Sequence, residues 1–114
     1  MSLFKIFRPN EWHNFEGNAV FKGSVDDLRD GFIHFSAGEQ MAGTLAKYYI
    51  NEPSIIIARV DNPDWGHQLK WEVSRGGAKF PHLYTDLHMD DVKEHWRLDK
   101  QKAQPWDIAK IISE

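Results

Sequence analysis

The most apolar run of this 114-residue chain, residues 55–60 with the sequence IIIARV, constrains the fold more than any other segment. Its β-branched isoleucines and valine favour a strand, and the Asp61-Asn62-Pro63 triplet that follows ends it. A short, continuous apolar run of this kind is typical of a strand that is covered on both faces. We therefore predict that residues 55–60 lie at the centre of a sheet and belong to the core.

The remaining segments predict short strands and one main helix. Strands are expected at residues 3–7, 20–23, 30–36, 69–74 and 94–98. A helical turn is expected at residues 9–12, a turn at residues 25–29 and a C-terminal helix at residues 106–112. The main helix is predicted over residues 37–49, because Ser36 and Glu39 have the spacing of a capping box. Short strands that alternate with one main helix predict an α+β fold.

The apolar positions of the two predicted helices indicate which faces they bury. Residues spaced three or four apart share one face of a helix. On the main helix this face carries Met41, Leu45 and Tyr48. On the C-terminal helix it carries Ile108, Ile111 and Ile112. We expect both sets to point into the core.

Size, charge and residue content exclude several classes of function. A chain of this length holds one core, so we predict a single domain over residues 1–114. The absence of cysteine excludes disulfides, thiolate nucleophiles and cysteine-based zinc sites. The net charge of -3, with no basic cluster, disfavours a nucleic-acid partner, and neither a signal peptide nor a membrane-spanning run is recognisable. We expect a cytoplasmic protein with a small-molecule ligand and no membrane partner; its oligomeric state stays open.

A single histidine stands out in the predicted strand over residues 30–36. Alternation places His34 on one face with Phe32 and Ser36, whereas the two other apolar residues of the strand point to the opposite face. His34 is therefore either an ordinary hydrogen-bonded residue of a sheet or one wall of a ligand cleft beside a helix start. Because Ser36 is assigned to the helix cap, only His34 is retained as a chemical candidate.

A second group of chemically distinctive residues occurs within residues 71–84. It contains a carboxylate, a guanidinium, an imidazole, two glycines and aromatic side chains, at Trp71, Glu72, Arg75, Gly76, Gly77, Phe80, His82 and Tyr84. A Gly-Gly hairpin between two strands would explain the loop without a ligand. That explanation accounts less well for Glu72 and His82, which we predict to be catalytic together with His34.

Other kinds of site receive less support from the sequence. His34, Glu72 and His82 would offer two imidazoles and a carboxylate to a metal ion, but no common metal-binding spacing is present, so no metal is expected. Ser36 lacks the surroundings of a nucleophile elbow. The two adjacent glycines lack the spacing of a dinucleotide fingerprint.

At these same residues the chain resembles a bacterial family, the domain of unknown function nine-five-two. The resemblance rests on residues 4–6, 11–12, 30–36, 69–72, 75–77 and 80–84, together with Gln40 and Thr44. It extends from residue 3 to about residue 98, which leaves residues 99–114 as a C-terminal extension. That family is grouped by remote similarity with the ADP-ribosyltransferase-like folds. The resemblance therefore implies two small, mostly antiparallel sheets with one main helix and short flanking helices, packed around an NAD-binding cleft.

The resemblance also implies roles for individual residues. His34 would contact the ribose or nicotinamide of NAD, and Glu72 would stabilise the positive charge that develops as the N-glycosidic bond breaks. His82 would transfer a proton. The expected ligand contacts are Phe32, Gln40, Thr44, Trp71, Arg75, Gly76, Gly77 and Tyr84, with Arg75 on the pyrophosphate.

Three functions follow from these expectations. The first is recognition of NAD or an ADP-ribose-like ligand, with ADP-ribosyltransferase or glycohydrolase chemistry. The second is a noncatalytic module that binds a small ligand or a protein. The third is an NAD-consuming RNA phosphotransferase, which the acidic balance of the chain disfavours.

Overall fold

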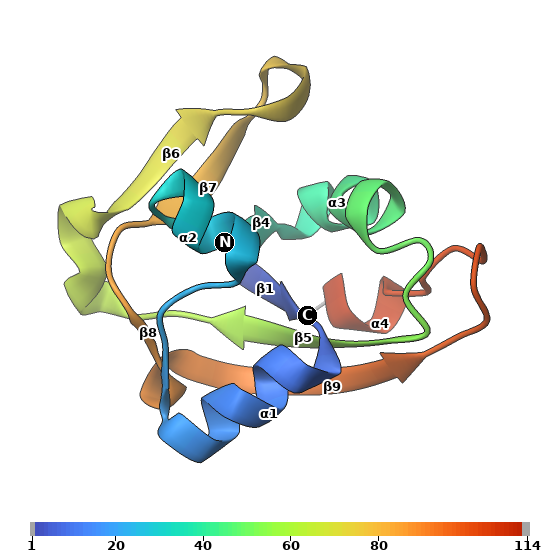
Figure 1. Cartoon of the computed structure of the whole chain (residues 1–114). Coiled ribbons are helices and arrows are strands. Elements are labelled where there is room, and N and C mark those ends of the chain that lie inside the picture. Colours follow the sequence, from blue (N-terminus) through green and yellow to red (C-terminus); the bar gives the residue numbers. More distant parts are fainter. Residues whose placement is uncertain (1, 113–114) are drawn as a thin grey trace.

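The computed structural model describes residues 2–112, apart from the side chain of Arg75, as antiparallel sheets with helices packed against them (Figure 1). The largest sheet has the order β4 (Ser36–Ala37), β1 (Leu3–Phe7), β5 (Ser54–Val60), β9 (Val92–Asp99). A second sheet has the order β3 (Ile33–His34), β7 (Lys79–Leu83), β6 (Leu69–Val73), and a third pairs β2 (Val20–Phe21) with β8 (Leu87–His88). The helices are α1 (Pro9–Asn18), α2 (Val25–Asp30), α3 (Met41–Tyr48) and α4 (Ala109–Ile112). The α+β class with small antiparallel sheets is confirmed, although the described strands form three sheets rather than two.

Strand β5 is covered on both faces, which confirms the predicted central strand. It pairs with β1 on one side and with β9 on the other. Ile56 packs in one cluster with Phe7 and the aromatic side chains of α1. Ile57 points to the opposite face, where it packs in a second cluster with Met41 of α3 and Ile111 of α4. The two clusters hold α1, α3 and α4 against the largest sheet.

Two helical segments are longer than predicted. Residues 25–29, expected to be a turn, form helix α2, because Ser24 and Asp27 satisfy one another's backbone N–H groups in a capping box. Gly31, with a φ of 87°, takes the left-handed conformation that ends this helix. The helical turn expected at residues 9–12 continues as the ten-residue helix α1.

The predicted capping box of Ser36 and Glu39 is wrong. Ser36 lies in strand β4, where its Oγ is 3.1 Å from Oγ1 of Thr44. The backbone N–H of Ala37 is instead bound by Oε1 of Gln40, and a short 3-10 turn leads into α3. The capping role therefore belongs to Gln40.

The predicted core faces of the helices are correct except at their last residues. Met41, Leu45, Ile108 and Ile111 are buried. Tyr48 is 48% exposed and Ile112 is 40% exposed, because each is the last residue of its helix. The C-terminal helix is also shorter than predicted, since α4 begins only at residue 109. No helix within residues 2–112 is long and apolar enough to cross a membrane.

The strand predicted over residues 30–36 is broken into two strands that belong to different sheets. Asp30 ends helix α2, β3 contains only Ile33 and His34, and the chain enters β4 after Phe35. Phe35 donates its backbone N–H to the carbonyl of Pro81 at 3.0 Å. Ile33 and Phe35, which alternation assigned to one face, are both buried.

The other predicted strands are confirmed as β1, β2, β6 and β9. Strand β6 is the outer strand of its sheet, and with β7 it forms a hairpin that extends away from the largest sheet (Figure 1). For this reason the apolar face of β6 is largely uncovered, with Trp71 39% and Val73 65% exposed. Its opposite face carries Glu72 toward the neighbouring strand β7.

Candidate functional site

A cleft of about 230 Å³ lies where the largest sheet meets the three-stranded sheet. Strands β1, β3, β4 and β7 and helices α2 and α3 supply its walls. Its lining includes Lys5, Asp27, His34, Thr44, Phe80 and His82. The two sequence segments that contain the predicted catalytic histidines therefore meet in one cleft.

The two histidines face one another across the pairing of β3 with β7. His34 and His82 are register partners, and their ring centroids are 5.6 Å apart. The Nδ1 atom of His34 is 2.6 Å from Oδ1 of Asp27, and the Nδ1 atom of His82 is 2.9 Å from Oε1 of Glu72. Phe32 stacks on His82 with a centroid distance of 4.0 Å. Each imidazole is thus oriented by its own carboxylate.

Asp27 is the most constrained ionisable side chain of the cleft. It is 2% exposed, and its Oδ2 accepts hydrogen bonds from Nζ of Lys5 and from the backbone N–H of Ser24, both at 2.9 Å. Burial alone would raise the pKa of Asp27, but the Lys5 ammonium and the hydrogen bonds from His34 and Ser24 hold it well below its usual range. Asp27 is therefore a fixed negative charge behind His34.

Glu72 lies beside the cleft rather than in its wall. Its Oε1 accepts a hydrogen bond from the hydroxyl of Tyr84 at 2.6 Å as well as the contact from His82. The hydrogen bond from Tyr84 and, to a smaller extent, the one from His82 lower the pKa of Glu72. The hydrogen bond between Tyr84 and Glu72 also raises the pKa of Tyr84. Glu72 is absent from the cleft lining, and its contact with His82 connects it to the cleft wall.

Replacing Tyr84 with phenylalanine is expected to raise the pKa of Glu72. The tyrosine hydroxyl donates to the ionised carboxylate, so its removal makes protonation of Glu72 easier. A carboxyl ¹³C NMR titration of both proteins measures the change. Trp71→Phe, on the opposite face of β6, is the control and should leave the Glu72 titration in place; an unchanged midpoint in Tyr84→Phe would contradict the expectation.

The remaining predicted ligand residues are distributed unevenly. Thr44 lines the cleft, whereas the side chain of Gln40 ties the start of α3 to the carbonyl of Lys79 at 2.7 Å. Trp71 points to the opposite face of β6 from Glu72.

In the loop that follows β6, Ser74 lines the cleft, whereas Gly76 and Gly77 are absent from its lining. Gly76 and Gly77 have φ angles of 64° and 79° in an exposed turn, which turn geometry explains. The predicted role of the Arg75 side chain lies outside the described residues.

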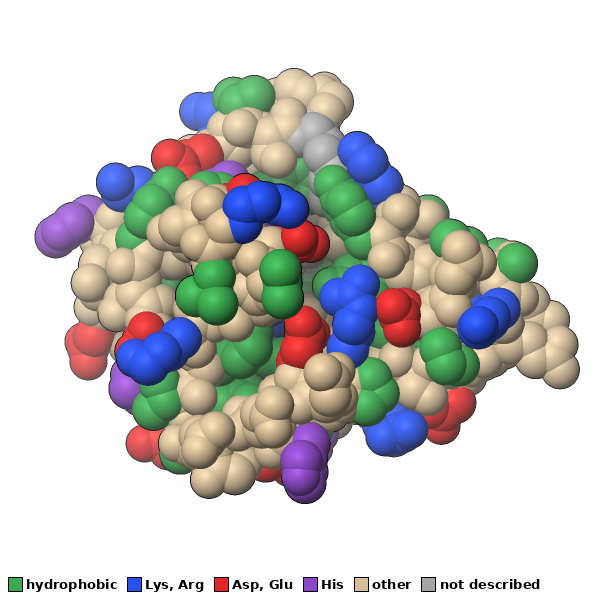
Figure 2. All heavy atoms as spheres, in the orientation of Figure 1, with side chains coloured by type: hydrophobic (Ala, Val, Ile, Leu, Met, Phe, Trp, Pro, Cys, Tyr) green, Lys and Arg blue, Asp and Glu red, His purple; other side chains and the backbone are tan. Residues whose placement is uncertain are grey.

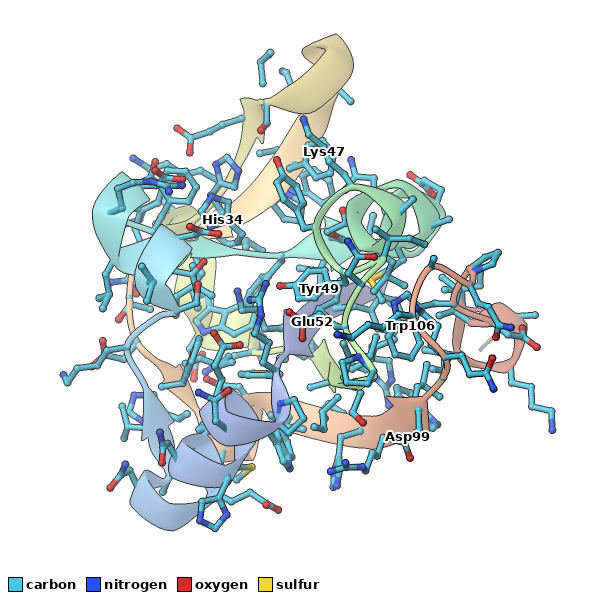
Figure 3. The ribbon with its side chains drawn as sticks, turned by 45° about the vertical axis from the view of Figure 1, so that its right-hand side comes forward. His34, Lys47, Tyr49, Glu52, Asp99 and Trp106 are labelled. Atoms are coloured by element: carbon cyan, nitrogen blue, oxygen red, sulfur yellow. The ribbon has the colours of Figure 1, made fainter. Side chains whose placement is uncertain are left out.

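The sequence did not reveal the residues at the other end of the cleft. Arg8 lies there with its guanidinium carbon 4.8 Å from the ring centroid of Tyr49 and its Nε bonded to Glu52 at 3.0 Å. Figure 3 shows Tyr49 and Glu52 close together near the centre of the view, with His34 above and to the left of them. Burial raises the pKa of Tyr49 to about 12. No motif or spacing connects these residues, whereas the Ser24 and Asp27 spacing contained a usable helix-cap signal.

Charged side chains of both signs surround the cleft. Acidic and basic side chains alternate at the centre of the face in Figure 2, with hydrophobic side chains beside them. The basic residues in the lining are Lys5, Arg8 and Arg29, and the acidic ones are Asp26, Asp27 and Asp30. Among the side chains that the structure describes, no three histidine or acidic residues form a group able to hold a metal ion.

Comparisons with known proteins identify a family and solved structures. The model of the family described as "Protein of unknown function (DUF952)" matches residues 6–95. A crystal structure of protein CC0527 from Caulobacter crescentus is 37% identical, with a TM-score of 0.92 over 100% of both chains. A solution NMR structure of CC0527 is 38% identical, with a TM-score of 0.83 over 96% of this chain and 94% of that one. No curated protein matches.

Proposed function

This chain belongs to the DUF952 family of proteins of unknown function, and we propose that its cleft binds NAD or an ADP-ribose-like ligand within an ADP-ribosyltransferase-like fold. The observation that carries the proposal is the pair His34 and His82, which face one cleft and are each held at Nδ1 by a carboxylate. Among the described residues, no hydrogen bond engages Nε2 of His82, so this atom is suited to a hydrogen bond with a ribose hydroxyl or to proton transfer. Both ring nitrogens of His34 contact carboxylates, so His34 presents its ring face to the ligand.

The size of the cleft supports partial enclosure of such a ligand. Pockets that enclose most of a drug-sized ligand measure about 300–1,000 Å³, whereas this cleft measures about 230 Å³. We therefore place the nicotinamide and its ribose inside, and the adenosine half outside. Phe80 and Tyr49 in the lining offer aromatic surface to a planar ring.

The charges of the lining support the same orientation of NAD, with the nicotinamide half inside the cleft. Lys5 and Arg29 are engaged by neighbouring carboxylates, so the cleft interior carries little excess positive charge. Arg8 is bonded to Glu52 through Nε, so its two terminal nitrogens are available to an acceptor on a ligand. A guanidinium stacked on an aromatic ring is well suited to phosphate. We propose Arg8 as the phosphate contact, in addition to the role expected for Arg75.

The chemistry proposed for the site is cleavage of the nicotinamide N-glycosidic bond. In hydrolysis, a water oxygen bonds to the ribose anomeric carbon, the electron pair of the broken bond goes to nicotinamide, and the water proton passes to a base. In transfer, a nucleophile of an acceptor takes the place of water. His82, supported by Glu72, is the proposed base, and Asp27 and Asp30 lie on either side of the His34 ring to stabilise developing positive charge.

A noncatalytic binding module is the second candidate. It is favoured by one observation, that Glu72 lies outside the cleft lining and is engaged by Tyr84 and His82. The two functions are separated by measuring nicotinamide release. If NAD binds without nicotinamide release and Glu72→Gln binds equally well, the site is a binding module.

NAD is expected to raise the melting temperature of the protein, and the increase should continue to grow with NAD concentration above Kd. A ligand that binds only the folded state stabilises it in proportion to the logarithm of its concentration above Kd. His34→Ala and Arg8→Ala should each raise the apparent Kd for NAD tenfold or more and so reduce the increase in melting temperature. The reason is that hydrogen bonds to charged or oriented groups contribute about 1.5–3 kcal/mol. Thermal scans with NAD up to millimolar concentrations measure it. Arg97→Ala, on β9 outside the cleft, is the matched control; a flat titration of the wild type would contradict the proposal.

A further inference from the structure

We infer that Asp27 is a positioning residue for His34, with Lys5 as its buried counter-ion. The inference deepens the proposed function, on which its ligand measurement rests. Asp27 comes from helix α2, Lys5 from strand β1 of the largest sheet and His34 from strand β3 of the three-stranded sheet. The contact therefore joins three elements at the base of the cleft.

The two oxygens of Asp27 divide their contacts between support and orientation. Oδ2 accepts from Nζ of Lys5 and from the backbone N–H of Ser24, both at 2.9 Å, which fixes the carboxylate in place. Oδ1 accepts from the backbone N–H of His34 at 3.2 Å and contacts its ring Nδ1 at 2.6 Å. One oxygen thus holds both the backbone and the imidazole of the same residue.

Burial gives this contact more weight than the other carboxylate at the ring. The side chain of Asp27 is 2% exposed and that of Lys5 is 5% exposed. Asp30 contacts Nε2 of His34 at 3.0 Å, but its side chain is 33% exposed and it also pairs with Arg29. A buried carboxylate is less screened by water than an exposed one, so Asp27 is the group that sets the ring orientation.

A carboxylate is required here because every neighbouring group is a donor. The carboxylate accepts from Lys5, Ser24 and the backbone and ring of His34 without offering a hydrogen. An asparagine side chain would direct its NH₂ group at one of these donors. In the wild type the carboxylate favours the tautomer with the hydrogen on Nδ1 of His34, as a buried carboxylate does for a catalytic histidine. With asparagine this preference is lost.

The test compares the position of the His34 ring proton in variants whose folding is preserved. Asp27→Asn removes the negative charge. The double variant Lys5→Met with Asp27→Leu replaces the buried ion pair by apolar side chains of similar size, and proteins with such a replacement generally fold. Imidazole ¹⁵N NMR of the unliganded proteins reports the Nδ1 proton directly. We expect Nδ1 of His34 to be protonated in the wild type and only partly protonated in both variants, with NAD affinity reduced about tenfold or more.

Asp91→Asn is the matched control for the loss of a buried capping carboxylate. Asp91 is 4% exposed and accepts hydrogen bonds from the backbone of His88 and from Asn62, outside the cleft lining. It should lower stability while the His34 signals stay unchanged. If the folded double variant keeps the wild-type Nδ1 signal, the inference is overturned. If wild-type NAD binding fails while the Nδ1 signals respond as expected, only the proposed function fails.

Discussion

Replacing Asp27 with alanine will lower the free energy of unfolding by about 3–5 kcal/mol, because the buried Lys5 ammonium loses its counter-ion. Both side chains of the pair are almost fully excluded from water, and their charged atoms are 2.9 Å apart. The remaining charge is then buried without compensation, which costs more than the lost contact itself. Urea unfolding at neutral pH, with equal m-values for both proteins, measures the difference.

The neighbouring Asp26 supplies the control for this substitution. Its side chain is 59% exposed and pairs with Arg29 on the same helix, so Asp26→Ala should change stability by no more than about 0.5 kcal/mol. Combining Asp27→Leu with Lys5→Met should restore part of the loss, because no ammonium is then buried without a counter-ion, although the backbone N–H groups of Ser24 and His34 still lose their acceptor. Equal losses for the alanine variants at positions 26 and 27 would show that the buried pair is unimportant.

The stability that Asp27 contributes should also depend on pH. Because the folded-state pKa of Asp27 is depressed, its contribution is complete above the unfolded pKa of about 3.9 and is lost as the pH falls through the folded value. The difference between the wild type and Asp27→Ala is therefore expected to be constant from pH 7 to about pH 5. It should shrink progressively below about pH 4.

Leu83→Ala is expected to cost about 2–5 kcal/mol, because a fully buried leucine leaves both lost apolar contact and a cavity. Leu83 lies on β7 next to His82 but points to the opposite face, where it is 0% exposed and packs in the cluster that contains Phe7. It pairs with Ile33 of β3 and with Leu69 of β6. This row attaches the three-stranded sheet to the rest of the core, and chemical denaturation measures its contribution.

Val73→Ala is the matched control for Leu83→Ala in the same sheet. Val73 is 65% exposed at the end of β6, so its truncation should change stability by less than about 0.5 kcal/mol. A second measurement follows the His82 ring signals at low temperature, where both variants are folded. They should shift in Leu83→Ala, whose strand loses packing behind His82, and stay in place in Val73→Ala. Similar stability losses in both variants would contradict the assigned packing.

Patterns of apolar residues predicted the strands well because burial dictates them locally. The run of isoleucines in β5 is covered on two faces, and this shows directly in the sequence. The division of residues 30–36 between two sheets was not predictable, since Phe35 is turned by a hydrogen bond to Pro81, which is distant in sequence. Ser36 is a residue type that commonly caps helices, but here it pairs with β1 as part of strand β4.

The part of the candidate site that could be predicted is the part in which alternation along a strand determines where a side chain points. Alternation groups Phe32 with His34, and the rings of both lie against that of His82, whereas Tyr84 joins the group through its ring contact with Phe32. Arg8 and Asp27 escaped prediction, because helix α2 and the start of α1 reach the cleft only through tertiary packing. Their contribution depends on contacts between elements rather than on spacing within one.

The crossing of the chain from β3 to β4 makes the cleft preorganised. His34 and Ser36 both line it, yet they belong to different sheets and are separated only by the buried Phe35. Moving the sheets apart would break the bond from Phe35 to Pro81 or the pairing of Ser36 with Phe4. Helix α2 is tied to β1 and β3 through Asp27. Adjustment to the proposed ligand is therefore expected at helix α3, so binding should proceed with small backbone change and little loss of conformational entropy in the sheets.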